Sequence, residues 1–94
     1  MKEEGFRLII TVIGQDRVGI IANIAQILAE SNVNILDITQ TILQEIFTMI
    51  MVVDIRQSKI DVAELNRRLT AKGEEMGLVI TTQHEDIFRF MHRI

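Results

Sequence analysis

The chain has 94 residues, a net charge of −3, 48% hydrophobic residues and no cysteine. This length predicts one domain, and the acidic balance argues against the basic surface that is typical of nucleic-acid-binding proteins. The lack of cysteine excludes disulfides and thiolate chemistry, and no apolar run reaches the roughly 18 residues that a membrane-spanning helix needs.

The first half of the chain alternates between strand-like and helix-like patterns. Residues 6–13 are apolar and β-branched, which predicts a strand buried on both sides. Residues 14–19 begin and end with glycine and predict a strand-to-helix turn, in which Asp16 is a candidate N-cap. Residues 18–31 predict a helix with a narrow polar stripe and a wide apolar surface, and residues 35–43 alternate as a half-buried strand does.

The second half begins with a third strand, predicted over residues 46–55, in which both faces are largely apolar. The connection Gln44-Glu45 lacks the Gly or Asn that is usual in a tight hairpin, so the sequence leaves the turn type open.

A second helix and a fourth strand follow. Asp61 and Glu64 have the spacing of a capping box, and Gly77 is well placed to end the helix that they open. Residues 78–83 predict the fourth strand. The C-terminal residues, about 85–93, predict a short amphipathic helix whose charges suit the helix dipole.

The predicted order is βαββαβ, so we expect an α+β, ferredoxin-like fold with a four-stranded antiparallel sheet and two helices on one face. Residues 1–94 would form a single domain with its core at about 6–84 and the C-terminal helix appended. The other face of the sheet is too apolar for water, so a partner subunit, the C-terminal helix or both should cover it. We place eight residues on that face: Ile9, Thr11, Ile13, Thr39, Thr41, Ile50, Val52 and Thr81.

The run from Ile10 to Ala22, followed by Asn34-Ile35, resembles the ACT domain family. These domains are small βαββαβ regulatory modules that bind amino acids and related metabolites. The later runs 37–41 and 47–49 are similar to a narrower group, the small stand-alone ACT proteins of prokaryotes. The resemblance covers about residues 6–84.

The resemblance implies a ligand at a subunit interface, in contact with the first strand-to-helix turn and with the residue that begins the second strand. The candidate ligand-binding residues are Gly14, Asp16, Arg17, Val18, Gly19 and Asn34. Some serine-binding members carry a polar side chain where this chain has Gly14. Structural roles remain open for several of them: an N-cap for Asp16, turn geometry and packing for the two glycines, an exposed cation for Arg17 and a helix terminus for Asn34.

The leading interpretation is a non-enzymatic regulatory module that forms a homodimer or higher homo-oligomer. An amino-acid-like ligand would bind between the turn of one subunit and Asn34 of its neighbour, and an unidentified partner protein would read out the bound state. The alternative is a dimeric interaction module without a ligand, or a regulatory subunit of a larger enzyme.

Other function classes have less support. Ser31 and Ser58 lack the context of an activated nucleophile, and His84 and His92 lack a recognisable metal-ligand spacing, so we expect no catalytic residues, metal or cofactor. RNA binding on a sheet of this topology would need aromatic residues, but the chain has four Phe and neither Tyr nor Trp. The acidic start, Met1 to Glu4, is a poor secretion signal, so we expect a cytoplasmic protein. The acidic charge balance and the lack of a long apolar run predict that it has no nucleic-acid or membrane partner.

Overall fold

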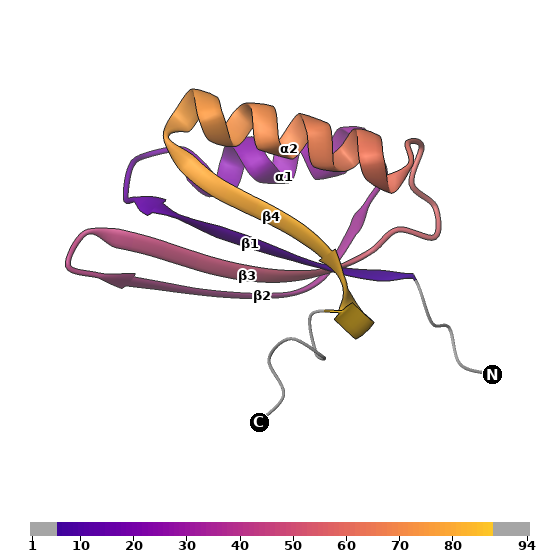
Figure 1. The fold of residues 1–94 in the computed structure, drawn as a ribbon, viewed down its shortest axis with the longest axis horizontal. Helices are drawn as coiled ribbons and strands as arrows, with labels where there is room; N and C mark the ends of the chain where they lie inside the picture. Colours follow the sequence, from indigo (N-terminus) through magenta and orange to yellow (C-terminus); the bar gives the residue numbers. More distant parts are fainter. Residues whose placement is uncertain (1–5, 88–94) are drawn as a thin grey trace.

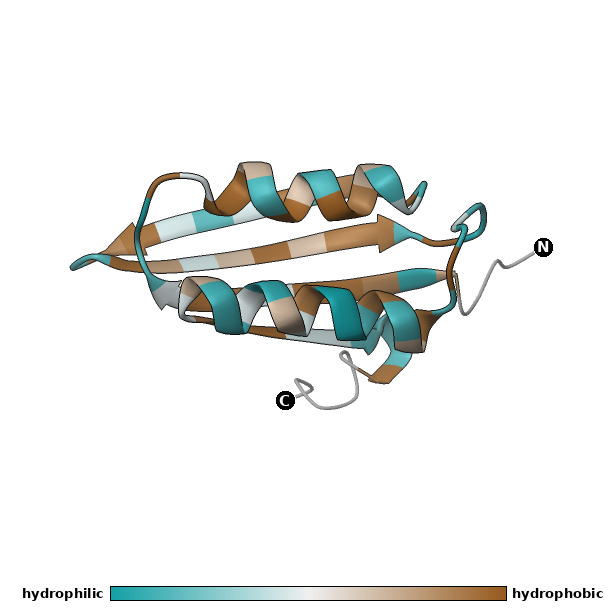
Figure 2. Cartoon of the chain, turned by 90° about the horizontal axis from the view of Figure 1, so that it is seen from above, coloured by the Kyte–Doolittle hydropathy of each residue, from teal (hydrophilic) through white to brown (hydrophobic). Residues whose placement is uncertain are grey.

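The computed structural model describes residues 6–87, which follow the predicted order of strands and helices (Figure 1). All strand pairs are antiparallel, and the helices lie side by side across one face of the sheet (Figure 2). The ferredoxin-like α+β fold is thereby confirmed. Its strands lie in the order β2-β3-β1-β4, and its elements are β1 (Arg7–Gln15), α1 (Ile20–Glu30), β2 (Asn34–Leu43), β3 (Ile46–Asp54), α2 (Val62–Met76) and β4 (Leu78–His84).

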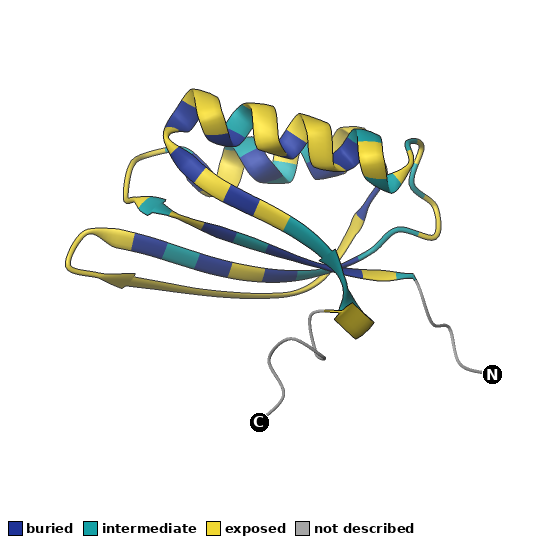
Figure 3. Ribbon diagram, in the orientation of Figure 1, coloured by how far each residue is buried: buried dark blue, intermediate teal, exposed yellow. Residues whose placement is uncertain are grey.

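The hydrophobic core lies between the sheet and the two helices. Alternate residues of the central strands point into it, as the period of two in a strand requires. The helices contribute residues at helical spacing, such as Leu65 and Leu69 of α2, so that one side of each helix is buried (Figure 3). The strand residues in this core are Leu8, Ile10 and Val12 of β1, Phe47, Met49, Met51 and Val53 of β3, and Leu78 and Ile80 of β4.

The predicted ends of α2 are confirmed. Asp61 is the N-cap, and its carboxylate accepts a hydrogen bond of 2.8 Å from the Glu64 N–H. The helix ends at Gly77, whose backbone is left-handed. Only the start of the predicted C-terminal helix can be compared: residues 85–87 are helical, and the remainder lies outside the described residues.

The hairpin between β2 and β3 is a two-residue turn without glycine. Gln44 and Glu45 both adopt positive φ, at 50° and 70°, which is the pattern of a type I′ turn. Non-glycine residues adopt this conformation at a cost. The Glu45 carbonyl accepts a hydrogen bond of 2.8 Å from the Asp16 N–H, which ties the hairpin to the turn after β1.

Two expectations about burial are wrong. The first strand is not buried on both sides, because the helices cover one face only and Ile13 on the other face is 47% exposed. The second strand is not half-buried: all ten residues of β2 are exposed, because β2 is an edge strand that the helices leave uncovered (Figure 3). Its alternation is nevertheless as predicted, since Thr39 and Thr41 pair with Ile50 and Thr48 on the face opposite the helices.

Candidate functional site

The turn between β1 and α1 holds five of the six predicted site residues. It begins in the last part of β1 and ends at Gly19, which is the N-cap of α1 with φ of 94°. The hydrogen bond from the Asp16 N–H to Glu45 places this turn beside the β2–β3 hairpin, at one end of the sheet. The N-terminus of α1 therefore lies at the end of the molecule where β2 ends.

The packing around Gly14 leaves little space for a side chain. A Cβ atom there would lie 2.6 Å from the Leu78 Cδ2 and 3.0 Å from the Gly77 carbonyl oxygen. Gly14 pairs with Phe47 on one side and Leu78 on the other, so it lies on the face that the helices cover. These contacts support the packing role for Gly14, and they explain why the chain has no polar side chain at this point.

Gly19, rather than Asp16, caps α1, so the prediction of Asp16 as N-cap is wrong. α1 begins at Ile20 and has no side-chain cap hydrogen bond. The left-handed backbone of Gly19 makes the change of direction that an Asp N-cap, which favours extended backbone, cannot make. The Asn23 amide donates a hydrogen bond of 2.7 Å to the Gly19 carbonyl and so supports the turn from within the helix.

Arg17 and Val18 project from the turn. The Arg17 Nη1 donates to the Met76 carbonyl at 3.4 Å, and this carbonyl belongs to the last turn of α2. A cation there complements the negative end of the helix dipole, and α2 has no basic residue in its own last turn. Val18 is 96% exposed and has no part in the core.

Asn34 lies at the other end of α1. It is the first residue of β2 and pairs with Asp54, the last residue of β3. Because the 11 residues of α1 span about 16 Å, Asn34 and the turn are separated within one chain by the length of this helix. A single chain therefore does not bring the six predicted residues together.

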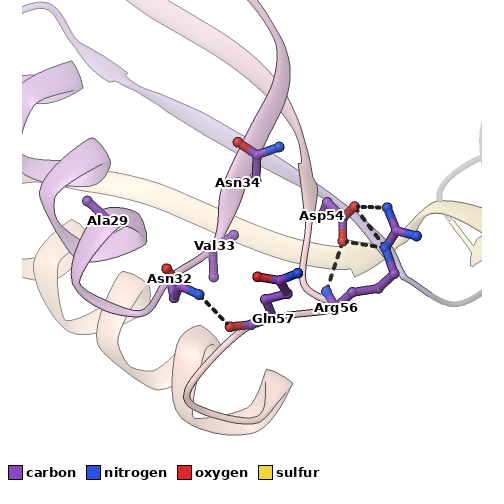
Figure 4. Close-up of a pocket in the computed structure, with 7 residues that line it drawn as sticks. All are labelled: Ala29, Asn32, Val33, Asn34, Asp54, Arg56 and Gln57. Atoms are coloured by element: carbon purple, nitrogen blue, oxygen red, sulfur yellow. Dashed lines mark hydrogen bonds and ion pairs between the residues drawn. The ribbon is translucent and has the colours of Figure 1, made fainter.

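Asn34 lines a pocket of about 680 Å³ at its end of the molecule (Figure 4). The Asn32 side-chain amide donates a hydrogen bond of 2.9 Å to the Gln57 carbonyl and so closes one side of the pocket. Asp54 and Arg56 form an ion pair of 2.7 Å, and the Arg56 hydrogen bonds hold the pKa of the Asp54 carboxyl below its usual value. The residues that line the pocket are Ala29, Asn32, Val33, Asn34, Asp54, Arg56 and Gln57.

Sequence reasoning found only Asn34 of this pocket. Asp54, Arg56 and Gln57 follow no motif, and they come near Asn34 only because β2 and β3 pair antiparallel, so that the start of one strand meets the end of the other. The amide, carboxylate and guanidinium groups offer both donors and acceptors to a polar ligand. Within residues 6–87 there is no cluster of three or more potential metal ligands, and no helix of that segment could span a membrane.

The sequence profile of the ACT domain matches residues 7–83. A UPF0237 protein of Methanocaldococcus jannaschii is 56% identical over 88 residues, which cover 94% of this chain and 98% of that protein. The structure is similar to an ACT domain protein from Streptococcus pneumoniae, with a TM-score of 0.76, 40% identity and coverage of 88% and 93% of the two chains. It is also similar to the regulatory subunit of aspartate kinase from Thermus thermophilus, with a TM-score of 0.64, 25% identity and coverage of 83% and 50%.

Proposed function

Because the chain belongs to the ACT domain family, we propose that it is a non-enzymatic regulatory module that binds an amino-acid-like metabolite between two subunits. The site combines the turn of one subunit, from Gly14 through Asp16, Arg17 and Val18 to Gly19, with Asn34 of the partner subunit. The protein acts in the cytoplasm as a homodimer or a higher homo-oligomer.

The exposed edge of β2 is the observation that carries this proposal. Every residue of β2 is exposed, and its apolar residues Ile38 and Ile42 are 42% and 54% exposed. An uncovered edge strand pairs readily with another strand, and the two-fold symmetric solution is antiparallel pairing of β2 with β2 of a second copy.

Antiparallel pairing of this kind would complete the site. β2 begins at Asn34 and ends beside the turn, since the Asp16 N–H bonds to the hairpin that follows Leu43. When two such strands run antiparallel, Asn34 of the partner subunit comes to the end at which the turn lies. The separation of about 16 Å within one chain is then bridged between chains.

The chemistry of the two halves suits a small zwitterionic or carboxylate ligand. The N-terminus of α1 offers N–H groups that hold an anion. Asn34 adds a donor and an acceptor from the other subunit. A ligand that touches both chains stabilises the paired assembly by its differential affinity for the paired and unpaired states, and a partner protein would respond to that difference.

A thermal-shift screen of amino acids and one-carbon metabolites tests the proposal, since a ligand that is specific to the native state raises the melting temperature. We expect at least one compound to raise it, and Asn34→Ala to remove the shift without changing the melting temperature of the free protein, because Asn34 is exposed. Thr70→Ala, on the exposed surface of α2, is the matched control and should retain the shift. If no compound in a broad panel shifts the melting temperature, the proposal of a metabolite sensor is wrong.

Gly14 favours a second candidate, a ligand-free dimeric interaction module or regulatory subunit of a larger enzyme. Leu78 and Gly77 crowd the space that a polar side chain would need at this position, and such a side chain is what some serine-binding ACT domains use. The similarity to the regulatory subunit of aspartate kinase is in keeping with a subunit role. A pull-down that returns one stoichiometric partner in the same amount with and without metabolites would favour this candidate.

A further inference from the structure

The sheet face opposite α1 and α2, hereafter the open face, carries no charge in its central part. The strand register places alternate residues of β1, β3 and β4 on it. On this face the hydroxyls of Thr11 and Thr81 hydrogen-bond to each other across β1 and β4, which partly satisfies these two polar groups. The central residues are Ile9, Thr11 and Ile13 of β1, Thr48, Ile50 and Val52 of β3, and Val79 and Thr81 of β4.

Burial on the open face changes along the strands. Ile9 is 6% exposed, whereas Ile13, four residues further along β1, is 47% exposed. On β3, Val52 is half-buried and Ile50 is 39% exposed, and on β4, Val79 is 66% exposed. At the end of the sheet where β1 begins and β4 finishes, the open-face residues Ile9 and Val52 are therefore more buried than Ile13, Ile50 and Val79 nearer the other end.

The C-terminal segment starts at that same end and on that same side. Residues 85–87 form a helical turn on the side of the sheet opposite α1 and α2 (Figure 1). The Glu85 carboxylate lies 3.5 Å from the Arg7 Nε, and Arg7 belongs to the open face by its register. Ile87 is 51% exposed, so its apolar side chain is itself without full cover.

The sequence of the segment fits the open face. Arg89, His92 and Arg93 fall on one side of a helix, and the remaining residues form an apolar side at the spacing i, i+1, i+3, i+4, i+7. A helix of ten residues is about 15 Å long, which matches four to five residues of a strand. The apolar residues are Ile87, Phe88, Phe90, Met91 and Ile94.

We propose that residues 85–94 continue as one helix that docks its apolar side on the open face of its own chain. From the Arg7–Glu85 ion pair, its length takes it as far as Thr11 and Thr81. The docked helix excludes water from the open face and keeps a second copy from packing there. Self-association is thereby directed to the edge of β2.

Cross-linking in the full chain tests this docking, and the lack of native cysteine means that only introduced thiols react. The test variant carries Thr81→Cys and Met91→Cys, and the control carries Glu74→Cys, on the exposed surface of α2, with the same Met91→Cys. A short bis-maleimide should link Thr81→Cys to Met91→Cys within one chain, at a yield several-fold above the control. Links between chains, equal yields in the two variants, or no link in either would overturn the proposal.

A second measurement separates docking from mere proximity. Phe88→Ser with Met91→Ser should lower the melting temperature by several degrees and raise the fluorescence of a hydrophobic dye several-fold, because the open face becomes exposed to water and to the dye. The matched pair Arg89→Ser with Arg93→Ser, on the polar side of the helix, should leave both readouts unchanged. Equal effects of the two pairs would contradict the docking.

Discussion

At the scale of single residues, the two glycines of the turn have different physical roles. At Gly14 the neighbouring residues disfavour a side chain, since Leu78 and Gly77 occupy the space that it would need. At Gly19 the backbone conformation favours glycine, because φ of 94° is strained for any other residue. Space is less restrictive there, since a Cβ atom would meet only the Asn23 amide at 3.3 Å. The sequence shows two glycines and cannot distinguish these roles, because the neighbours of Gly14 come from a strand 64 residues later.

We therefore expect Gly14→Ala to be more destabilising than Gly19→Ala. The first substitution overpacks a backbone contact and should lower the free energy of unfolding by about 1–3 kcal/mol, and the second adds backbone strain of about 1 kcal/mol. Urea unfolding followed by circular dichroism measures both. A Gly14→Ala variant as stable as the wild type would contradict the packing role.

At the scale of elements, the two helices begin in different ways. Asp61 caps α2 with its side chain, whereas α1 relies on the left-handed backbone of Gly19. The side-chain cap of α2 is a local signal, so the sequence predicts it; the Glu64 carboxylate does not complete a capping box but accepts hydrogen bonds from Arg67 and Arg68. Asp16 has the same residue type as Asp61, but it lies three positions before the cap residue Gly19, because the chain must first turn from β1 onto the face of the sheet.

This difference predicts that Asp61→Ala should cost about 1 kcal/mol of stability, whereas Asp16→Ala, as the matched control, should remain within about 0.5 kcal/mol of the wild type. The reason is that only Asp61 satisfies a helix N–H group. Chemical denaturation of the two variants under identical conditions gives the comparison. Equal losses would indicate that Asp16 has a structural role that its exposed position does not reveal.

At the scale of the whole molecule, most of the exposed large apolar side chains of the described residues lie in two places, and Val18 and Ile21 at the start of α1 are exceptions. One is the open face, and the other is the edge strand β2, whose side toward the helices shows Ile35, Ile38 and Ile42. The two helices cover one face of the sheet and leave the open face and the edge strand β2 without cover. The strand order and the position of the helices therefore decide where the apolar residues that the core does not bury lie on the surface.

Charges on β2 should accordingly separate the subunits. Ile38→Asp with Ile42→Asp places carboxylates where two β2 strands would meet, and the like charges of two copies repel. We expect light scattering to show a shift from oligomer to monomer, with the fold retained because both positions are exposed. Thr70→Asp with Glu74→Gln, on exposed positions of α2, should leave the oligomeric state unchanged. A wild-type chain that is itself a monomer at micromolar concentration would remove the basis of the edge-pairing proposal.

The sequence by itself determined the order of the elements, the faces of the strands and the capping of α2, since these depend on periodicity and on neighbours within a few residues. It also located the turn from Gly14 to Gly19 and placed the second strand at residues 35–43, one residue short of its start at Asn34. Only the tertiary structure decided that these two parts lie at opposite ends of α1, that β2 is exposed along its length, and that Asp54, Arg56 and Gln57 share a pocket with Asn34. The physical reason is that strand order and helix coverage depend on contacts between residues that are distant in the sequence, and no local pattern records those contacts.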